Sequence, residues 1–211
     1  MISVVIRNRN EERWIGHSIQ SCINYLENPE IIVVDNNSLD ESVSIVKEFC
    51  FNNIKVVNID DYTPGKSINR GIKEATNENV LVLSAHSILT ENIDLPEIDK
   101  LLDKYVAVFG KQTPVYRGRE INKRYVWSHF TDKKEENMWS HSEKRHFLHN
   151  AFCFYKKSFL LENPFDEKLI GKEDRYWVND MIEKGYNFLY YPALECTHHW
   201  TPAGATWKGL G

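Results

Sequence analysis

Short runs of apolar, mostly β-branched residues alternate with longer amphipathic stretches through residues 1–87. Runs of this length and composition are typical of strands buried on both faces. The predicted strands are residues 2–6, 30–34, 53–59 and 79–83. Apolar residues recur near helical spacing between them, which predicts helices at residues 12–25, 39–51 and 67–75. This β-α-β-α-β-α-β order favours an α/β fold with a mostly parallel sheet flanked by helices.

The second half of the chain is less regular. Its predicted elements are strands at residues 105–110, 150–155 and 188–191 and helices at 156–161 and 174–184. Gly185 directly follows the last of these helices, as a C-terminal cap does. The highly charged residues 117–145 predict a helical excursion, and a solvated surface helix fits them equally well. Residues 201–211 are rich in glycine and predict a flexible tail, and 211 residues in all fit a single domain.

Polar residues follow each of the four predicted strands of the first half. These loops are residues 7–11, 35–38, 60–66 and 84–87. In open α/β sheets, ligands bind beyond the carboxyl ends of the strands. The pattern therefore predicts a pocket for a polar ligand such as a nucleotide at this edge.

Charge and composition narrow the classes of protein. The net charge is −4, from 26 basic and 30 acidic residues, which argues against a general nucleic-acid binder. No apolar run approaches the roughly 20 residues that cross a bilayer, and no signal peptide is recognised. The four cysteines are scattered without a Cys-x-x-Cys pair, which disfavours a zinc finger and favours buried, reduced thiols. We therefore expect a cytoplasmic protein, with at most peripheral contact at the inner face of the membrane.

Six segments, taken in order, resemble family 2 glycosyltransferases. They read SVVIRNRNE at 3–11, IVVDNNSLD at 32–40, GKSINRG at 65–71, NAFCFYKK at 150–157, PFDE at 164–167 and GKED at 171–174. The resemblance implies a GT-A fold, a nucleotide-sugar donor and inversion at the anomeric carbon. It implies an acceptor hydroxyl on a glycan or lipid-linked glycan, as in polysaccharide biosynthesis. It also implies a nucleotide-binding half at residues 1–87 and an acceptor-side half at 88–200.

The strand ends supply the candidate donor-binding residues. Asp35 ends the second predicted strand, where a carboxylate can accept hydrogen bonds from a base or a ribose. The same residue could instead cap the following helix, and both roles can coexist. Asn37, on the same turn, is a further donor-binding candidate. By resemblance Arg7, Asn8 and Glu11 border the nucleotide, although a plain surface loop is the alternative.

Residues 65–71 depart from the family pattern. The family often has an arginine before the asparagine here, and this chain has Ile68 before Asn69. Lys66, beside a predicted helix N-terminus, is placed to contact a phosphate, and Lys66 or Arg70 could substitute for the missing arginine. Lys66 and Asn69 are therefore assigned to donor binding.

The sharpest departure is at residues 84–86. There the family carries Asp-x-Asp, which holds Mg²⁺ or Mn²⁺ against the donor diphosphate, and this chain has Ser84 and His86. One interpretation is that His86, Lys66 and a C-terminal histidine, His198, neutralise the diphosphate without a metal. A second is that His86 and His198 bind Mn²⁺, and a third is that the site has lost activity. No metal is assigned, and Ser84, His86 and His198 are taken as donor-binding.

The resemblance assigns the chemistry to Glu173 and Asp174. Asp174 matches the family's general base, which takes the proton of the acceptor hydroxyl, and Glu173 stands beside it. Both could instead merely complement a helix N-terminus. Asn150 and Trp177 are the acceptor-binding candidates.

Two other functions were weighed. A sugar-nucleotide nucleotidyltransferase shares the general fold but would carry a glycine-rich loop after the first strand, and residues 7–13 contain no glycine. A non-catalytic sugar-nucleotide-binding protein is supported by the absent Asp-x-Asp and opposed by Asp174.

Overall fold

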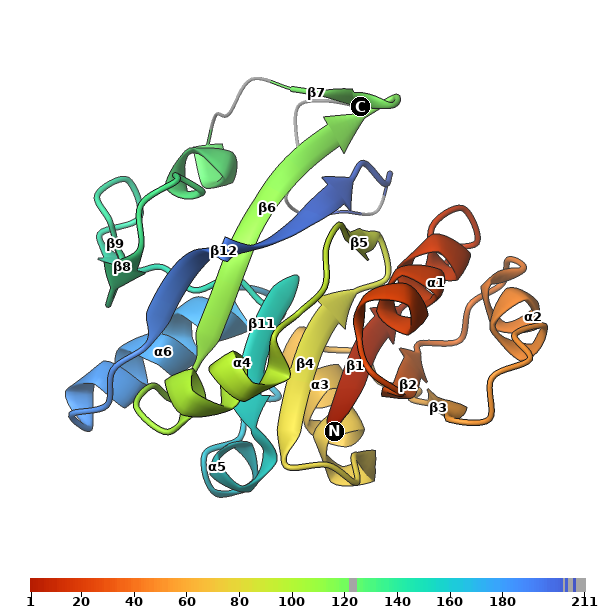
Figure 1. Ribbon diagram of the computed structural model, residues 1–211, viewed down its shortest axis with the longest axis horizontal. Coiled ribbons are helices and arrows are strands. Elements are labelled where there is room, and N and C mark those ends of the chain that lie inside the picture. Colours follow the sequence, from red (N-terminus) through yellow and green to blue (C-terminus); the bar gives the residue numbers. More distant parts are fainter. Residues whose placement is uncertain (122–124, 203, 205–206, 208–211) are drawn as a thin grey trace.

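One twisted sheet runs through the molecule (Figure 1). The computed structural model describes residues 1–121, 125–202, 204 and 207. The strands follow one another in the order β3-β2-β1-β4-β11-β6-β12-β5. Their bounds are β1 Ile2–Asn8, β2 Glu30–Asp35, β3 Ile54–Asn58, β4 Asn79–Ser84, β5 Ser87–Leu89, β6 Val108–Tyr116, β11 Phe152–Lys156 and β12 Leu189–His199.

The sheet is mixed, and its parallel part is the one that the sequence predicts. Strands β1 to β4 are all parallel to one another where they pair. Strand β11 then runs antiparallel to both β4 and β6, and β12 runs parallel to β6. The carboxyl ends of β1, β2 and β4 consequently meet at one edge, which is where the candidate site lies.

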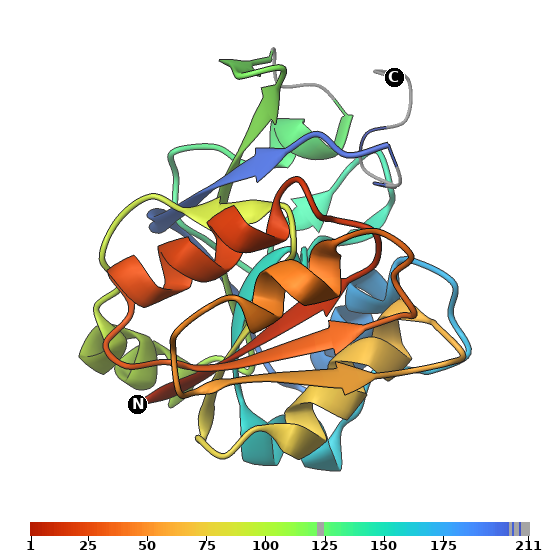
Figure 2. The same ribbon diagram turned by 90° about the vertical axis from the view of Figure 1, so that its right-hand side faces the viewer.

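Helices cover both faces of the sheet. Helices α1 (Ile15–Tyr25), α2 (Ser42–Lys47) and α4 (Leu95–Leu102) pack on one face, and α3 (Pro64–Glu74), α5 (Lys157–Glu162) and α6 (Glu173–Glu183) on the other. Figure 2 shows α1 and α2 lying on the side of β1 and β2 opposite to α3. Because side chains alternate along a strand, Val4 and Ile6 of β1 face α1 whereas Val5 faces α3. This two-sided burial explains the continuous apolar runs.

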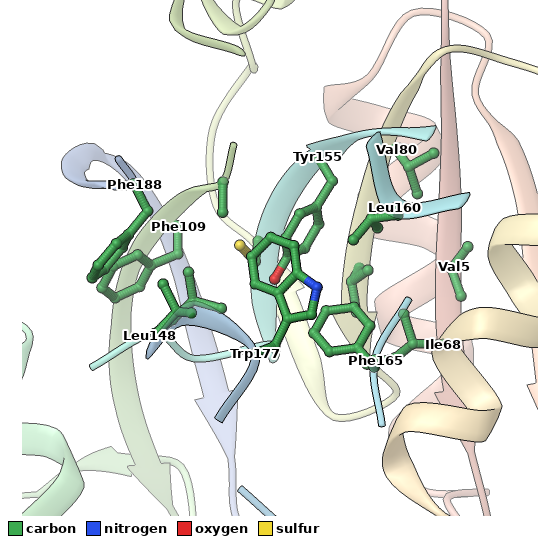
Figure 3. Packing of buried hydrophobic residues seen from close by; sticks show 14 of the residues in the cluster. Val5, Ile68, Val80, Phe109, Leu148, Tyr155, Leu160, Phe165, Trp177 and Phe188 are labelled. Atoms are coloured by element: carbon green, nitrogen blue, oxygen red, sulfur yellow. The ribbon is translucent and has the colours of Figure 1, made fainter. Parts of the chain in front are cut away.

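The core beneath α3, α5 and α6 is rich in aromatic rings (Figure 3). Trp177 packs edge-on against Tyr155 at a ring-centroid distance of 5.5 Å and lies 5.2 Å from the ring of Phe165. Helix α3 approaches β1 so closely that a Cβ on Gly71 would lie 2.2 Å from Val5 Cγ1. A glycine is therefore required at that contact.

The prediction of a helical segment at residues 117–145 is wrong over its described part. The described residues there form strand β7 (Arg119–Glu120), the 3₁₀ helix η1 (Tyr125–His129), and strands β8 (Glu135–Glu136), β9 (Trp139–Ser140) and β10 (Arg145–His146). Apolar anchors at irregular spacing hold this segment: Trp127, Phe130 and Met138 are buried. Their spacing follows no helical period, so the charge pattern alone was misleading.

Other differences are smaller. Helix α4 and strand β5 were not predicted, and α1 begins at Ile15 instead of residue 12. Cys22, Cys153 and Cys196 are buried thiols as expected, but Cys50 is exposed. Of the predicted flexible tail, only residues 201, 202, 204 and 207 are described, and the rest lies outside the described residues. In the described part of the chain, every helix is too short or too polar to cross a bilayer.

Candidate active site

A pocket of about 480 Å³ opens at the carboxyl ends of β1 and β4. Residues from both predicted halves, 1–87 and 88–200, line it. The predicted site residues found in its lining are Arg7, Asn8, Glu11, Ser84, His86, Asn150, Glu173, Asp174 and His198. The sequence therefore located most of one continuous site.

Arg7 lines the pocket and contacts residues of both halves. It is the register partner of Ser84 on β4. Its Nη1 donates to Glu173 Oε1 at 3.2 Å, and its Nη2 lies 3.5 Å from Ser84 Oγ. Burial works against the charge of Arg7, but its interactions with Tyr62, Glu173 and Asp174 outweigh this and raise the pKa of the guanidinium. Arg7 therefore keeps its positive charge in the pocket.

Asp35 lies beside the pocket and outside its lining. Its carboxylate accepts hydrogen bonds from Asn8 Nδ2 at 2.7 Å, from Ser38 Oγ at 2.6 Å and from the Ser38 N–H at 3.0 Å. These bonds order the loop after β2, but Asp35 caps no helix, because α2 begins at Ser42 and its N-cap residue is Glu41. The capping alternative is therefore wrong, and the nucleoside contact stays a prediction. Asn37 is exposed, with a left-handed φ of 48°, and donates to Asp60.

Three histidine rings gather on one wall of the pocket. His86 Nδ1 lies 3.0 Å from Glu11 Oε1, and the His86 and His198 ring centroids are 4.7 Å apart. Because a carboxylate only accepts, Glu11 fixes the proton on Nδ1 of His86. Burial, together with the positive charge of Arg7, holds the pKa of His198 well below its usual range. Burial also lowers the pKa of His149, to about 3, so both rings are neutral.

Glu173 and Asp174 begin α6 and line the same pocket. They follow Lys172, whose left-handed φ of 59° turns the chain into the helix. Asp174 accepts from the Asn150 N–H at 3.1 Å, from the Arg175 N–H at 2.8 Å and from Arg175 Nη1 at 2.7 Å. Oδ2 carries two of these bonds and Oδ1 one.

The two adjacent carboxyl groups have opposite pKa shifts. Burial alone would raise the pKa of Asp174, but the guanidinium of Arg175 and the hydrogen bonds lower it overall. Burial and the neighbouring charge of Asp174 raise the pKa of Glu173, against the opposing effect of Arg7. Asp174 is consequently ionised at neutral pH, as a group that accepts a proton must be.

Besides Asp35 and Asn37, the predicted residues Lys66, Asn69 and Trp177 are not in the lining of the pocket. Lys66 Nζ lies 3.5 Å from Asp61 Oδ2, at the surface. The side chain of Asn69 is bonded to the backbone of Phe165 through both its amide nitrogen and its oxygen. Asn69 therefore ties α3 to the loop after α5, which accounts for an asparagine at this position without a ligand.

Trp177, expected to contact the acceptor, is placed in the core instead. It is 4% exposed, and its indole N–H donates to the Asn163 carbonyl at 2.7 Å. The geometry gives no support to an acceptor contact. Trp177 lies one helical turn beyond Asp174, on the face of α6 that packs against the sheet.

The residues of the pocket do not fit a hard divalent cation. Ser84 offers one neutral hydroxyl, and the guanidinium of Arg7 lies beside it. His86 directs one ring nitrogen at Glu11. Among the described residues, no three His, Cys, Asp or Glu side chains are grouped so that they could hold a metal. Mg²⁺ requires near-octahedral oxygen ligands, which this set does not supply.

Sequence reasoning missed several residues of the pocket. His149 and Arg175 each adjoin a motif residue and could have been found by extending the motifs by one position. Tyr62, Tyr125 and Ile170 at the rim carried no pattern, because they lie in loops or in the irregular segment. Tyr125 and Ile170 are 76% and 94% exposed, which makes the rim partly apolar.

Comparisons with known proteins agree with this geometry. The family model "Glycosyl transferase family 2" matches residues 3–163. The O-antigen chain rhamnosyltransferase WbaN of Salmonella anatum is 27% identical over 207 residues, covering 92% of this chain and 65% of that protein. A Campylobacter jejuni GalNAc(5)-diNAcBac-PP-undecaprenol beta-1,3-glucosyltransferase is 27% identical over 194 residues, covering 88% and 61%. The chain thus spans less than two thirds of the length of these relatives.

A solved structure shows the same fold. Staphylococcus aureus TarS 1–349 in complex with UDP-GlcNAc superposes with a TM-score of 0.72 at 20% identity, covering all of this chain and 61% of that one. The sheet order and the flanking helices described above are therefore those of the GT-A fold, as the sequence predicted.

Proposed function

The chain belongs to glycosyl transferase family 2, and on that basis we propose that it transfers a sugar from a nucleotide-sugar donor to a hydroxyl of a glycan or lipid-linked glycan, with inversion. One observation carries the proposal. Two buried acidic side chains, Glu173 and Asp174, line one pocket together with the carboxyl ends of β1 and β4. That edge is where α/β sheets bind nucleotides, and a carboxylate in the same pocket can reach a second substrate.

The proposed step is a single displacement. The acceptor oxygen forms a bond to the anomeric carbon while the bond from that carbon to the donor phosphate breaks on the opposite face. The electron pair of the broken bond leaves with the nucleoside diphosphate, and the acceptor proton passes to Asp174. Because attack and departure are on opposite faces, the configuration inverts.

The arrangement of Asp174 suits this role. The guanidinium of Arg175 and the Asn150 N–H hold the carboxylate in place and ionised. The low pKa makes it a weak base toward a free alcohol. The alcohol becomes far more acidic as its oxygen bonds to carbon, so the proton transfers late in the step. Asn8 and Asp35 are the proposed nucleoside contacts, since they adjoin each other at the strand ends.

The proposed acceptor enters over the rim of Tyr62, Tyr125 and Ile170. Aromatic and aliphatic side chains there can pack against sugar rings or the start of a lipid chain. The names of the Salmonella and Campylobacter relatives, which mention an O-antigen chain and a PP-undecaprenol glycan, support such an acceptor. We place the activity at the cytoplasmic face of a membrane, in polysaccharide biosynthesis, with peripheral contact of this domain.

The products of donor breakdown separate this function from its two alternatives. The protein is incubated with UDP-, dTDP- and GDP-linked hexoses, and the nucleotides are resolved by anion-exchange chromatography. A transferase breaks the bond at the anomeric carbon and slowly releases a nucleoside diphosphate from one donor class. A nucleotidyltransferase would instead yield a nucleoside triphosphate when pyrophosphate is added. Donor binding without any breakdown would indicate a non-catalytic binding protein.

A further inference from the structure

We propose that the guanidinium of Arg7 takes the place of the divalent cation and neutralises the donor diphosphate directly, so that donor binding needs no metal. The inference rests on the proposed function and names how that site holds its donor. It replaces the sequence-based expectation that Lys66 and His86 supply the charge. Lys66 lies outside the lining of the pocket, and the Nδ1 of His86 is held by Glu11.

The position of Arg7 is set by the sheet. Arg7 on β1 and Ser84 on β4 are neighbours in register, and Ser84 occupies the first of the two positions where the family carries its metal-binding acids. Arg7 Nη2 lies 3.5 Å from Ser84 Oγ. The positive charge thus stands at the place that a cation would need.

Arg7 has hydrogen-bonding capacity to spare. One N–H of Nη1 is directed at Glu173. The Nε–H is buried and has no hydrogen-bond partner among the described residues. Each Nη also carries two N–H groups, and the bonds to Glu173 and Ser84 use one on each, which leaves one N–H on each Nη for a phosphate oxygen. The planar fork of a guanidinium matches two phosphate oxygens at once.

The residues around Ser84 favour the fixed charge of Arg7 over a bound divalent ion. A divalent ion placed at Ser84 would be repelled by Arg7, and Ser84 itself offers it only a neutral hydroxyl. Glu173 holds the other side of the guanidinium and orients it toward the pocket. An ordered cation that needs no reorganisation stabilises a leaving group as it gains charge.

Nucleotide calorimetry tests the proposal without relying on turnover. The nucleoside diphosphate that binds best among UDP, dTDP, GDP and CDP is titrated in EDTA and again in Mn²⁺, with its monophosphate as the matched ligand. We expect the same preference for the diphosphate over the monophosphate in EDTA as in Mn²⁺. In parallel, the free Mn²⁺ signal in electron paramagnetic resonance is recorded for Mn²⁺ mixed with the diphosphate, and adding the protein to that mixture should not lower the signal further.

Variants locate the charge. Arg7→Gln should weaken diphosphate binding about 10-fold or more, the scale of charge-assisted hydrogen bonds, and largely abolish the preference for diphosphate. Arg70→Gln, which removes an ion-paired arginine of α3 outside the pocket lining, should leave that preference unchanged. Arg7→Gln combined with Glu173→Gln removes both partners of the buried pair. This double variant replaces Arg7→Gln in the titration if the single variant folds poorly, and it should lose the preference for diphosphate over monophosphate in the same way.

Three results would overturn the proposal. Diphosphate binding that disappears in EDTA and returns with Mn²⁺ would show that a metal is used after all, with His86 and His198 as its candidate ligands. An unchanged preference for diphosphate in the Arg7 variants would remove Arg7 from the site. If none of the four nucleotides binds, the proposed function itself fails and the inference falls with it.

Discussion

Replacing Asp174 by asparagine tests the proposed base and the buried charge cluster together. Asn keeps one oxygen but turns the other position into an NH₂ group. Both positions of the carboxylate accept bonds from donors, namely the N–H groups of Asn150 and Arg175 and the Arg175 guanidinium. In either orientation of the amide, its NH₂ group therefore lies against an N–H donor and cannot accept a hydrogen bond from it. Arg175 also loses its negatively charged partner.

The expected cost in stability follows from those contacts. Removing one partner of a buried ion pair costs about 3–5 kcal/mol. Arg175 retains the ring of Phe147 at 4.4 Å and Glu143 Oε1 at 3.9 Å, which compensate in part. We therefore expect the free energy of unfolding to fall by about 2–4 kcal/mol at pH 7. Since the pKa of Asp174 is lowered in the folded state, its contribution is complete above its unfolded pKa, about 4, and is lost as the pH falls below that.

The assay pairs urea unfolding with donor breakdown and nucleotide binding. Asp180→Asn, an exposed carboxylate of the same helix, is the matched control and should change none of the three. In Asp174→Asn we expect donor breakdown or transfer to fall about 100-fold or more, the usual scale for a lost general base. Nucleotide affinity of the folded protein should stay close to that of the wild type. Turnover at the wild-type rate in a folded Asp174→Asn protein would refute the assignment of the base.

Two further predictions concern packing and pH. Gly71→Ala should destabilise the fold by about 1–3 kcal/mol in urea unfolding, because its Cβ would lie 2.2 Å from Val5 Cγ1. Gly171→Ala is the control and should be near neutral, because a Cβ there would meet no atom within 4 Å. Equal effects of the two substitutions would contradict the packing argument. The lowered pKa values of His149 and His198 mean that the unfolded state binds protons below pH 6.5 that the folded state excludes. Stability should therefore fall by about 1.4 kcal/mol per histidine between pH 7.5 and 5.5, and a flat profile over that range would show that these rings are protonated in the fold.

The N-terminal half of the fold was predictable because its residues obey one rule. Buried strands of a parallel sheet are apolar on both faces, so they stand out from the polar loops at their carboxyl ends. These loops lie at the edge of the sheet where ligands bind. The sequence alone therefore predicted that Arg7, Ser84 and His86 lie close together. Helix α4 was missed although its signal was present. Asp94 caps it by accepting from the Glu97 N–H, and Pro96 stands in its first turn.

The errors at the site have a common physical origin. Local sequence does not reveal whether a side chain near a motif reaches the pocket or the core. Asp174 and Trp177 are neighbours on one face of α6, yet Asp174 in the first turn lines the pocket and Trp177, one turn further along, packs in the core. Asn69 belongs to a motif but bonds to the Phe165 backbone, a long-range contact that no local pattern reveals. The pairing of Arg7 with Glu173 spans 166 positions and likewise required the folded structure.

The anomeric configuration of the product tests the central claim most directly. The donor that the protein breaks down is supplied in its α-linked form with methanol as a simple acceptor, and the methyl glycoside is examined by proton nuclear magnetic resonance. A methyl glycoside does not interconvert in water, so it preserves the outcome of the step. A single displacement in this pocket, with the proton passing to Asp174, predicts the β-glycoside. The α-glycoside would contradict inversion and the mechanism built on it.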